Sequence, residues 1–265
     1  MTIHQTAIIE KGAVVPKSCN IGPYCIIGAN VKLGDNVRLH SHVVISGYTE
    51  IGDGTEVFPF ASIGSKTQDL KYSEGVRSYV KIGKNNVIRE YVTINPGTDA
   101  NAITEVKDHC LLMIGVHIAH DCSVGNHVIM ANNCSLAGHV IIEDHAILGG
   151  FSIYHQFIRV GSYSIVGGGS TVVDNVIPYG NIMGDRAYLA GLNLIGMKRR
   201  NLTSEEMRTM QKAFDELFDI SSPVPIAERI EKAQNDYAAN PRVMEIIDFM
   251  NADSKRALCM PKANK

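Results

Sequence analysis

The sequence predicts a mainly β chain: a parallel β-helix of hexapeptide repeats followed by a small α-helical domain. Three observations predict this fold. An apolar residue recurs at every sixth position, the recurrence extends over most of the chain, and helical signals begin only near residue 200. A period of six does not match the 3.6-residue turn of an α-helix. It suits short strands, in which alternate residues share a face.

The repeat defines two sets of interior positions, the recurring apolar residue and the small or β-branched residue two places before it. Three hexapeptides form one coil, so residues 18 apart are expected to stack at about 4.8 Å, and the remaining residues should face outward or lie at corners. The recurring residues are Ile9, Val15, Ile21, Ile27, Leu33, Leu39, Ile45, Ile51, Val57, Ile63, Ile82, Ile88, Ile94, Val106, Leu112, Ile118, Val124, Met130, Leu136, Ile142, Leu148, Tyr154, Val160, Val166 and Val172.

The repeat also sets the domain boundaries. We expect the β-helix over residues 1–190 and an α-helical C-terminal domain over residues 191–265. Polar stretches at 65–79 and 96–103 interrupt the repeat and are predicted to be loops, which commonly carry function when they project from a rigid scaffold. In the second domain, Thr203 and Glu206 form a capping-box pattern that opens a helix, and further helices are predicted near Ile226–Tyr237 and Arg242–Met250.

Composition excludes several classes of function. The chain has 25 basic and 27 acidic residues, so no overall field favours nucleic acid or an anionic membrane. The sequence shows neither a signal peptide nor an apolar run long enough to span a bilayer, and we expect a cytoplasmic protein without stable membrane insertion. Five cysteines occupy interior positions and are interpreted as free thiols that fill the core: Cys19, Cys25, Cys110, Cys122 and Cys134.

The stretch from Gly115 to His139 concentrates the polar chemistry of the repeat. Stacking at 18 residues places Asp121 one coil below His139 and Gly138 directly above His120. A histidine beside a carboxylate, with room and a backbone N–H above it, is suited to act as a general base. The alternative is that any exposed corner of a coil can carry a histidine without a catalytic role.

A second set of histidines, His109, His127 and His145, is also spaced by 18, and Tyr91 and Tyr163 are expected to flank it in the same register. Three stacked imidazoles could bind Zn²⁺, but ligands along a line do not close readily around one tetrahedral ion. We therefore expect an aromatic ladder. The sequence offers no other metal-ligand spacing, phosphate loop or nucleophile elbow, and it predicts no metal and no cofactor.

Several segments together resemble the UDP-N-acetylglucosamine O-acyltransferases, which begin lipid A synthesis in Gram-negative bacteria. The resemblance covers nearly the whole chain. It rests on Gln68–Tyr72 (QDLKY), His117–Cys122 (HIAHDC), Leu136–Val140 (LAGHV), His155–Phe157 (HQF) and Gly196–Arg200 (GMKRR).

The resemblance implies a left-handed β-helix, a homotrimer with active sites between subunits, and transfer of a 3-hydroxyacyl chain from acyl carrier protein to the 3-position of the UDP-sugar. It implies that His120 removes the hydroxyl proton, that Asp121 orients it and that the Gly138 N–H stabilises the oxyanion, with no covalent acyl-enzyme. It also implies that Gly168 ends or opens the tunnel for the acyl chain. The residues that it assigns to substrate binding are Asp69, Lys71, Asn95, His117, His139, His155, Gln156, Asn193, Arg199 and Arg200.

Two positions depart from the family pattern. Asn95 stands where the family commonly has a histidine, which leaves a 3-hydroxyl and a 3-amino acceptor both open, and Ile195 replaces a usual acidic residue. Three other interpretations also stay open: a γ-type carbonic anhydrase, a related N-acyltransferase, which normally carries an extra N-terminal domain, and a purely structural solenoid.

Overall fold

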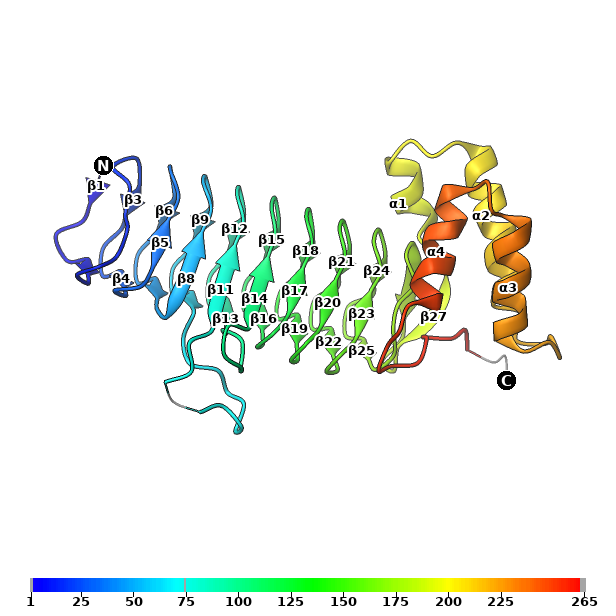
Figure 1. Cartoon of the computed structure of the whole chain (residues 1–265). Helices are drawn as coiled ribbons and strands as arrows, with labels where there is room; N and C mark the ends of the chain where they lie inside the picture. The colour runs from blue at the N-terminus through cyan, green and yellow to red at the C-terminus, as the bar shows by residue number, and fades with distance from the viewer. Residues whose placement is uncertain (1, 74, 263–265) are drawn as a thin grey trace.

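The computed structural model describes residues 2–73 and 75–262. Glu74, which belongs to the first predicted loop, and the chain ends Met1 and 263–265 lie outside the described residues. The predicted fold class, a left-handed parallel β-helix with C-terminal α-helices, is confirmed. Figure 1 shows successive coils stacked from the N-terminus along an elongated body, with the helices gathered at the far end.

The coils build three faces, each a sheet of short strands. The first face contains β1 (Thr2–Ile3), β3 (Asn20–Ile21), β6 (Arg38–Leu39), β9 (Glu56–Val57), β12 (Val87–Ile88), β15 (Leu111–Leu112), β18 (Ile129–Met130), β21 (Ile147–Leu148), β24 (Ile165–Val166), β26 (Gly180–Met183) and β27 (Tyr188–Leu192). The second face contains β2 (Ile8–Ile9), β4 (Ile26–Ile27), β7 (Val44–Ile45), β10 (Ser62–Ile63), β13 (Thr93–Ile94), β16 (His117–Ile118), β19 (Ser135–Leu136), β22 (Ile153–Tyr154) and β25 (Thr171–Val172). The third face contains β5 (Lys32–Leu33), β8 (Tyr48–Ile51), β11 (Tyr79–Ile82), β14 (Ile103–Val106), β17 (Ser123–Val124), β20 (Ile141–Ile142) and β23 (Arg159–Val160).

The interior follows the hexapeptide pattern. In the regular coils the strands pair in parallel with residues 18 apart in register, as Ile118 does with Leu136, whereas β26 and β27 at the end of the prism pair antiparallel. The repeated apolar side chains from Ile21 to Val172 are buried. Ile9 and Val15 are only half-buried, because the first coil has a neighbour on one side only. All six cysteines, including Cys259, are free and buried, which confirms the interior assignment of the five in the repeat.

Two insertions lengthen single coils without breaking the register. Ile63 pairs with Ile94, 31 residues later, and Ile94 pairs with Ile118, 24 residues later. The strands that follow, β11 and β14, begin at Tyr79 and Ile103, the last residues of the two ranges predicted as loops. Both insertions leave the prism between the second and third faces, where the longer one projects from the body (Figure 1). They therefore border the same corner.

Each corner carries a column of residues with left-handed backbone angles. We call the corner between the second and third faces the site corner (Asp121, His139, Phe157). The corner between the third and first faces is the histidine corner (His109, His127, His145, Tyr163). The corner between the first and second faces is the glycine corner; it contains Gly150 and Gly168, each followed by a left-handed residue, Phe151 and Gly169.

The predicted aromatic ladder forms at the histidine corner, but without Tyr91. The His109 and His127 rings stack at 4.9 Å, His127 and His145 at 4.7 Å, and His145 and Tyr163 at 4.9 Å between centroids. The placement of Tyr91 in this register is wrong, because the 24-residue coil shifts it to another corner, where it stacks on Phe60 at 5.2 Å.

The C-terminal helices are α1 (Leu194–Arg199), α2 (Ser204–Leu217), α3 (Ile226–Asp236) and α4 (Pro241–Asn251). The capping box at the start of α2 is present, since Thr203 and Glu206 each accept from the other's backbone N–H. Helix α1 was not predicted; its single turn and a half is too short for a periodic signal, and it begins at an Asn193 cap. Within the described residues, none of the helices combines the length and apolarity needed to cross a lipid bilayer.

Candidate active site

A cleft of about 720 Å³ opens at the site corner, beside both insertions. It gathers eight of the residues singled out in the sequence, although they come from five separate segments. Its lining comprises Thr67, Gln68, Asp69, Lys71, Asn95, Thr98, Asp99, His117, Ala119, His120, Ala137, Gly138, His139, Gln156 and Phe157.

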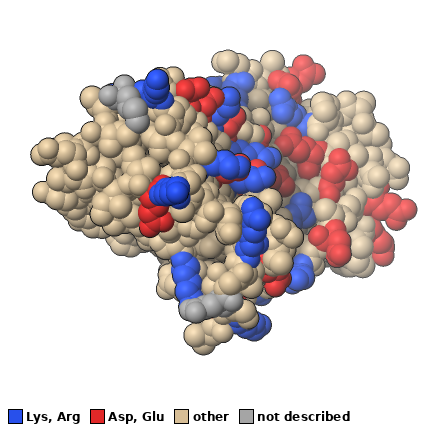
Figure 2. Space-filling model, turned by 60° about the vertical axis from the view of Figure 1, so that its left-hand side comes forward, with Lys and Arg blue, Asp and Glu red and all other residues tan. Residues whose placement is uncertain are grey.

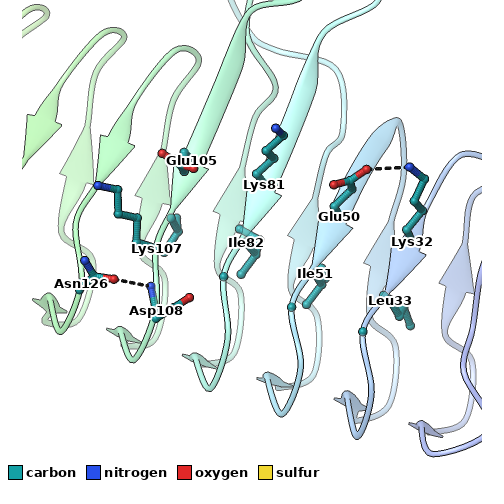
Figure 3. Close-up of a pocket in the computed structure, with 14 residues that line it drawn as sticks. Lys32, Leu33, Glu50, Ile51, Lys81, Ile82, Glu105, Lys107, Asp108 and Asn126 are labelled. Carbon is teal, nitrogen blue, oxygen red and sulfur yellow. Dashed lines mark hydrogen bonds and ion pairs between the residues drawn. The ribbon is translucent and has the colours of Figure 1, made fainter.

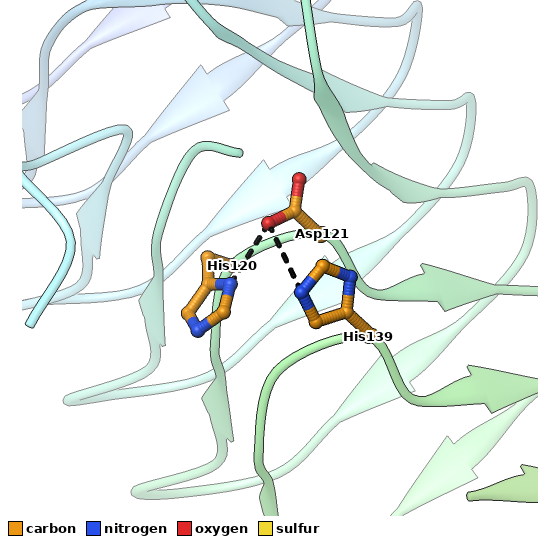
Figure 4. A group of neighbouring side chains, drawn as sticks. All are labelled: His120, Asp121 and His139. Carbon is orange, nitrogen blue, oxygen red and sulfur yellow. Dashed lines mark hydrogen bonds and ion pairs between the residues drawn. The ribbon is translucent and has the colours of Figure 1, made fainter. Parts of the chain in front are cut away.

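His120 and Asp121 are hydrogen-bonded to each other at the site corner (Figure 4). The Nδ1 of His120, a buried residue, lies 2.8 Å from Oδ2 of Asp121. An ionised carboxylate only accepts hydrogen bonds, so Nδ1 carries the proton and Nε2 is left as the acceptor. Two loop donors hold the same carboxylate oxygen: the Thr98 hydroxyl at 2.8 Å and the Thr98 backbone N–H at 3.2 Å. The ring orientation and tautomer of His120 are therefore set by a carboxylate that Thr98 itself holds in place.

Thr98 lines the cleft and binds Asp121, but it is not among the site residues that the sequence predicts. It lies in the second insertion, 23 residues before Asp121, and the hexapeptide pattern says nothing about where an inserted loop folds back. Thr104 adds a further support, since its hydroxyl accepts the Asp121 backbone N–H at 2.8 Å. This bond helps to hold Asp121 in its left-handed conformation, with φ of 59°.

Gly138 lies directly against the His120 ring. A Cβ at this position would come within 2.3 Å of Cε1 and 2.5 Å of Nε2 of His120. The absence of a side chain is what allows the next coil to approach the imidazole this closely. The stacking of Gly138 over His120, predicted from the repeat, is present in the structure.

His139 and His117 flank this pair. The His139 ring stacks on Phe157 at 4.6 Å, and its Nε2 lies 3.8 Å from Oδ2 of Asp121. The pKa of His139 is lowered mainly by burial, whereas the nearby Asp121 acts in the opposite direction. Burial also lowers the pKa of His117, whose Nδ1 lies 2.8 Å from the Thr93 hydroxyl, and the adjacent His120 adds to this shift. Both rings are thus neutral at neutral pH.

The first insertion contributes the other wall of the cleft. Asp69 places Oδ2 3.4 Å from Nε2 of His120, while its Oδ1 accepts the backbone N–H of Lys71 at 2.8 Å. Asn95 is buried, and its amide donates to the Ser65 carbonyl at 3.2 Å. The departure from the family pattern at Asn95 therefore sits at the point where the second face meets the base of this loop.

His155 and Gln156 extend the site toward the C-terminal tail. Gln156 lines the cleft, whereas His155 is exposed and contacts the guanidinium of Arg256. The Arg256 Nε–H also donates to the Gln156 carbonyl at 2.8 Å, and the Lys255 ammonium lies 4.1 Å from the centroid of the Phe157 ring. The sequence predicts neither basic residue at the site, because about a hundred positions separate them from the segment that they contact.

The remaining predicted substrate-binding residues lie at the other two corners. Asn193, Arg199 and Arg200 line a second cleft, of about 790 Å³, with the histidine corner and Ile195. Gly168 lies at the glycine corner, where a Cβ would meet the Gly150 carbonyl oxygen at 3.2 Å, in the predicted stacking register. A single chain does not bring these three groups together.

A group of possible metal ligands lies at the site corner itself, and another groove lies on the third face. His120, Asp121 and His139 offer ligand atoms within 4.8 Å of one another, a spacing that could hold a metal ion. A groove of about 590 Å³ runs along the third face, where outward charges alternate in sign (Figure 3). Its charges pair locally, as in the 2.8 Å contact between Lys32 and Glu50, and the Lys, Glu and Asp side chains that line it are typical of a solvated face. Figure 2 likewise shows basic side chains interspersed with acidic and neutral ones on the face in view.

Comparison with known proteins gives a consistent result. Residues 12–47 match the bacterial transferase hexapeptide model (six repeats), and residues 175–259 match domain 2 of the UDP N-acetylglucosamine O-acyltransferase model. A Bartonella tribocorum protein named acyl-[acyl-carrier-protein]–UDP-N-acetylglucosamine O-acyltransferase is 47% identical over 261 residues, covering 98% of this chain and 96% of the relative. A Rickettsia canadensis protein of the same name is 53% identical over 211 residues, covering 79% of each chain.

Solved structures agree in fold over nearly the full length. The Francisella novicida UDP-N-acetylglucosamine acyltransferase superposes with a TM-score of 0.93 at 34% identity, covering 99% of this chain and 95% of that one. The Moraxella catarrhalis UDP-N-acetylglucosamine O-acyltransferase gives a TM-score of 0.92 at 40% identity, covering 98% and 100%.

Proposed function

The chain belongs to the UDP-N-acetylglucosamine O-acyltransferases, and we propose that it transfers a 3-hydroxyacyl chain from acyl carrier protein to the 3-position of UDP-N-acetylglucosamine or of its 3-amino analogue. This reaction is the first step of lipid A biosynthesis. The observation that carries the proposal is the His120–Asp121 pair, hydrogen-bonded at 2.8 Å beneath Gly138 in the cleft at the site corner.

His120 acts as the general base. Its protonated Nδ1 is bound to Asp121, so the Nε2 lone pair is free to take the proton from the sugar's 3-hydroxyl or 3-amino group. The sugar heteroatom then bonds to the thioester carbonyl carbon, and the negative charge moves to the carbonyl oxygen. The Gly138 N–H is proposed to stabilise this oxyanion.

Collapse of the tetrahedral intermediate breaks the C–S bond. The imidazolium of His120 returns its proton to the leaving thiolate of the phosphopantetheine arm, which restores the neutral base. Asp121 supports the transient positive charge on the ring, and Thr98 keeps the carboxylate in place. The proposed mechanism uses no metal ion, no cofactor and no covalent acyl-enzyme.

The substrates are proposed to bind between subunits of a homotrimer. The predicted substrate residues lie at separate corners of one prism, and a neighbouring copy would be needed to bring the second cleft against the site corner. Asp69, Lys71, His117, His139, His155 and Gln156 would hold the sugar or the thioester arm. Arg199 and Arg200 suit the diphosphate because a guanidinium binds phosphate oxygens in a bidentate manner.

Asn95 is proposed to influence which acceptor is used. It lines the cleft beside His117, and its amide is held by the first insertion, so the group nearest the acceptor at this position is a neutral amide. Asn95→His should shift the ratio of kcat/KM toward the 3-hydroxyl sugar. An unchanged ratio would remove Asn95 from acceptor selection.

The test is a direct assay. Purified protein is incubated with 3-hydroxyacyl thioesters of acyl carrier protein and with each UDP-sugar, and the product mass is measured. We expect the product mass to exceed that of the UDP-sugar by one hydroxyacyl group. The rate of product formation should fall by a factor of about 10² to 10⁴ in His120→Ala and should be unchanged in His42→Ala, a corner histidine that does not line the cleft. Wild-type protein that yields no acylated sugar with either acceptor would refute the proposed function.

A further inference from the structure

The ladder at the histidine corner ends beside helix α1. Tyr163 stacks on His145 at 4.9 Å and on Tyr179 at 5.1 Å, with interplanar angles of 10° and 14°. The column therefore forms a continuous series of parallel rings along one edge of the prism. Two of its rings, His145 and Tyr163, line the second cleft together with Arg199 and Arg200.

Tyr163 contacts α1 at both of its ends. At the start of the helix, the Tyr163 carbonyl accepts a hydrogen bond from the Asn193 amide at 2.9 Å, and the Asn193 side-chain oxygen accepts the Gly196 N–H at 2.9 Å. At the end of the helix, the Arg200 guanidinium carbon lies 4.0 Å from the centroid of the Tyr163 ring. One residue of the prism thus fixes both the cap of α1 and the cation that follows it.

We propose that Tyr163 is a positioning residue that holds the Arg200 guanidinium toward the cleft in which the UDP-sugar diphosphate binds. This inference rests on the proposed role of Arg200. An exposed arginine side chain samples many rotamers, and fixing it on binding costs free energy. Stacking on a tyrosine ring restricts the guanidinium before the ligand arrives and leaves its N–H edge free for phosphate oxygens.

The neighbouring ring favours this arrangement. The pKa of His145 is lowered. Burial is the largest cause and the nearby Arg200 adds to it, whereas Asp144 acts in the opposite direction. His145 is therefore neutral at neutral pH and contributes an uncharged ring to the stack on which Arg200 rests.

The test compares substitutions that keep or remove the ring. Tyr163→Leu should raise the KM for the UDP-sugar about three- to tenfold, because a cation–π contact of this kind contributes that much to binding. The kcat and the KM for the acyl donor should change little, since the guanidinium acts on the nucleotide. Tyr163→Phe, which keeps the ring, should retain the wild-type KM.

The matched control is Tyr91→Leu. This residue also belongs to a corner column, where it stacks on Phe60, but it lies outside both clefts. The control should leave the KM for the UDP-sugar unchanged. Thermal unfolding and sedimentation of each variant check that fold and assembly survive.

A double-mutant cycle with Arg200→Ala separates the two proposals. If Tyr163 acts through Arg200, adding Tyr163→Leu to Arg200→Ala should raise the KM no further. Independent, multiplicative effects would overturn the positioning role, as would a normal KM in Tyr163→Leu when Arg200→Ala is impaired. If Arg200→Ala itself binds the UDP-sugar normally, the diphosphate role of Arg200 fails and the inference fails with it, whereas the acyl-transfer assay stands independently.

Discussion

Gly138→Ala should disable the proposed base, His120, by displacing its ring, although His120 itself is not substituted. The new methyl carbon would lie 2.3 Å from Cε1, 2.5 Å from Nε2 and 3.0 Å from Nδ1 of the His120 ring. Carbon atoms in normal contact are about 3.5 to 4 Å apart, so the ring has to move by roughly 1 Å. That movement strains or breaks the 2.8 Å bond from Nδ1 to Asp121.

The expected magnitude follows from this displacement. A misplacement of about 1 Å in a catalytic group costs about 10²-fold in rate, so kcat should fall about a hundredfold, with a smaller change in the KM for the UDP-sugar. The extra methyl also overpacks the corner, which should lower the free energy of unfolding by about 1 to 3 kcal/mol. Initial rates measured by product mass, together with thermal unfolding, provide both values.

Two comparisons test the reasoning. Gly28→Ala adds the same methyl at the site corner of an early coil, where its nearest neighbour is 3.4 Å away, and it should be nearly neutral. In a His120→Ala background the ring is absent, so adding Gly138→Ala should slow the reaction no further. Activity of Gly138→Ala within about twofold of wild type, in a protein that folds, would refute the claim that the Gly138 contact positions the base.

Four further outcomes are expected. Thr98→Val keeps the shape of the side chain but removes the 2.8 Å donor to Asp121; kcat should fall about tenfold, and an unchanged kcat would show that the carboxylate is held without it. Gly168→Met should shift the preferred acyl donor to a chain several carbons shorter in a competition assay, because each buried methylene contributes roughly 0.8 kcal/mol; an unchanged preference would place the length determinant elsewhere. Burial raises the pKa of the repeat thiols, to about 12 for Cys122, so native protein should react slowly with thiol reagents and denatured protein should titrate all six cysteines; rapid native labelling would contradict this. Finally, the lowered pKa values of His117 and His139 mean that the unfolded chain, with the ordinary value of 6.5, binds protons first as the pH falls; denaturant titrations should therefore show a smaller free energy of unfolding near pH 6 than near pH 7.5, and equal values would argue against neutral buried rings.

Much of the fold was determined by the sequence itself. In a solenoid each coil contacts only its neighbours, so a local period specifies which residues are interior and which residues stack. This is why the buried positions, the inward cysteines and the stacking of Gly138 over His120 could be predicted from spacing alone. The capping box at Thr203 was predictable for the same reason, since its two partners are three residues apart.

The insertions mark the limit of that local logic. A loop has no period, so nothing in the repeat indicated that Thr98 folds back onto Asp121 or that Asp69 approaches His120. The second insertion lengthens its coil from 18 to 24 residues, and Tyr91 therefore lies at a different corner from His109. The register of a column can be counted along the chain only where every coil has the same length.

Contacts between the prism and the C-terminal region were decided by tertiary structure alone. Arg256 contacts the segment at Gln156, and Arg200 stacks on Tyr163, across long separations in sequence. Each of these residues has ordinary surface chemistry when considered by itself. Arg200 follows α1 and Arg256 lies in the tail after α4, so each cation reaches its partner only because these segments pack against the end of the prism, where no repeat sets the position of a side chain.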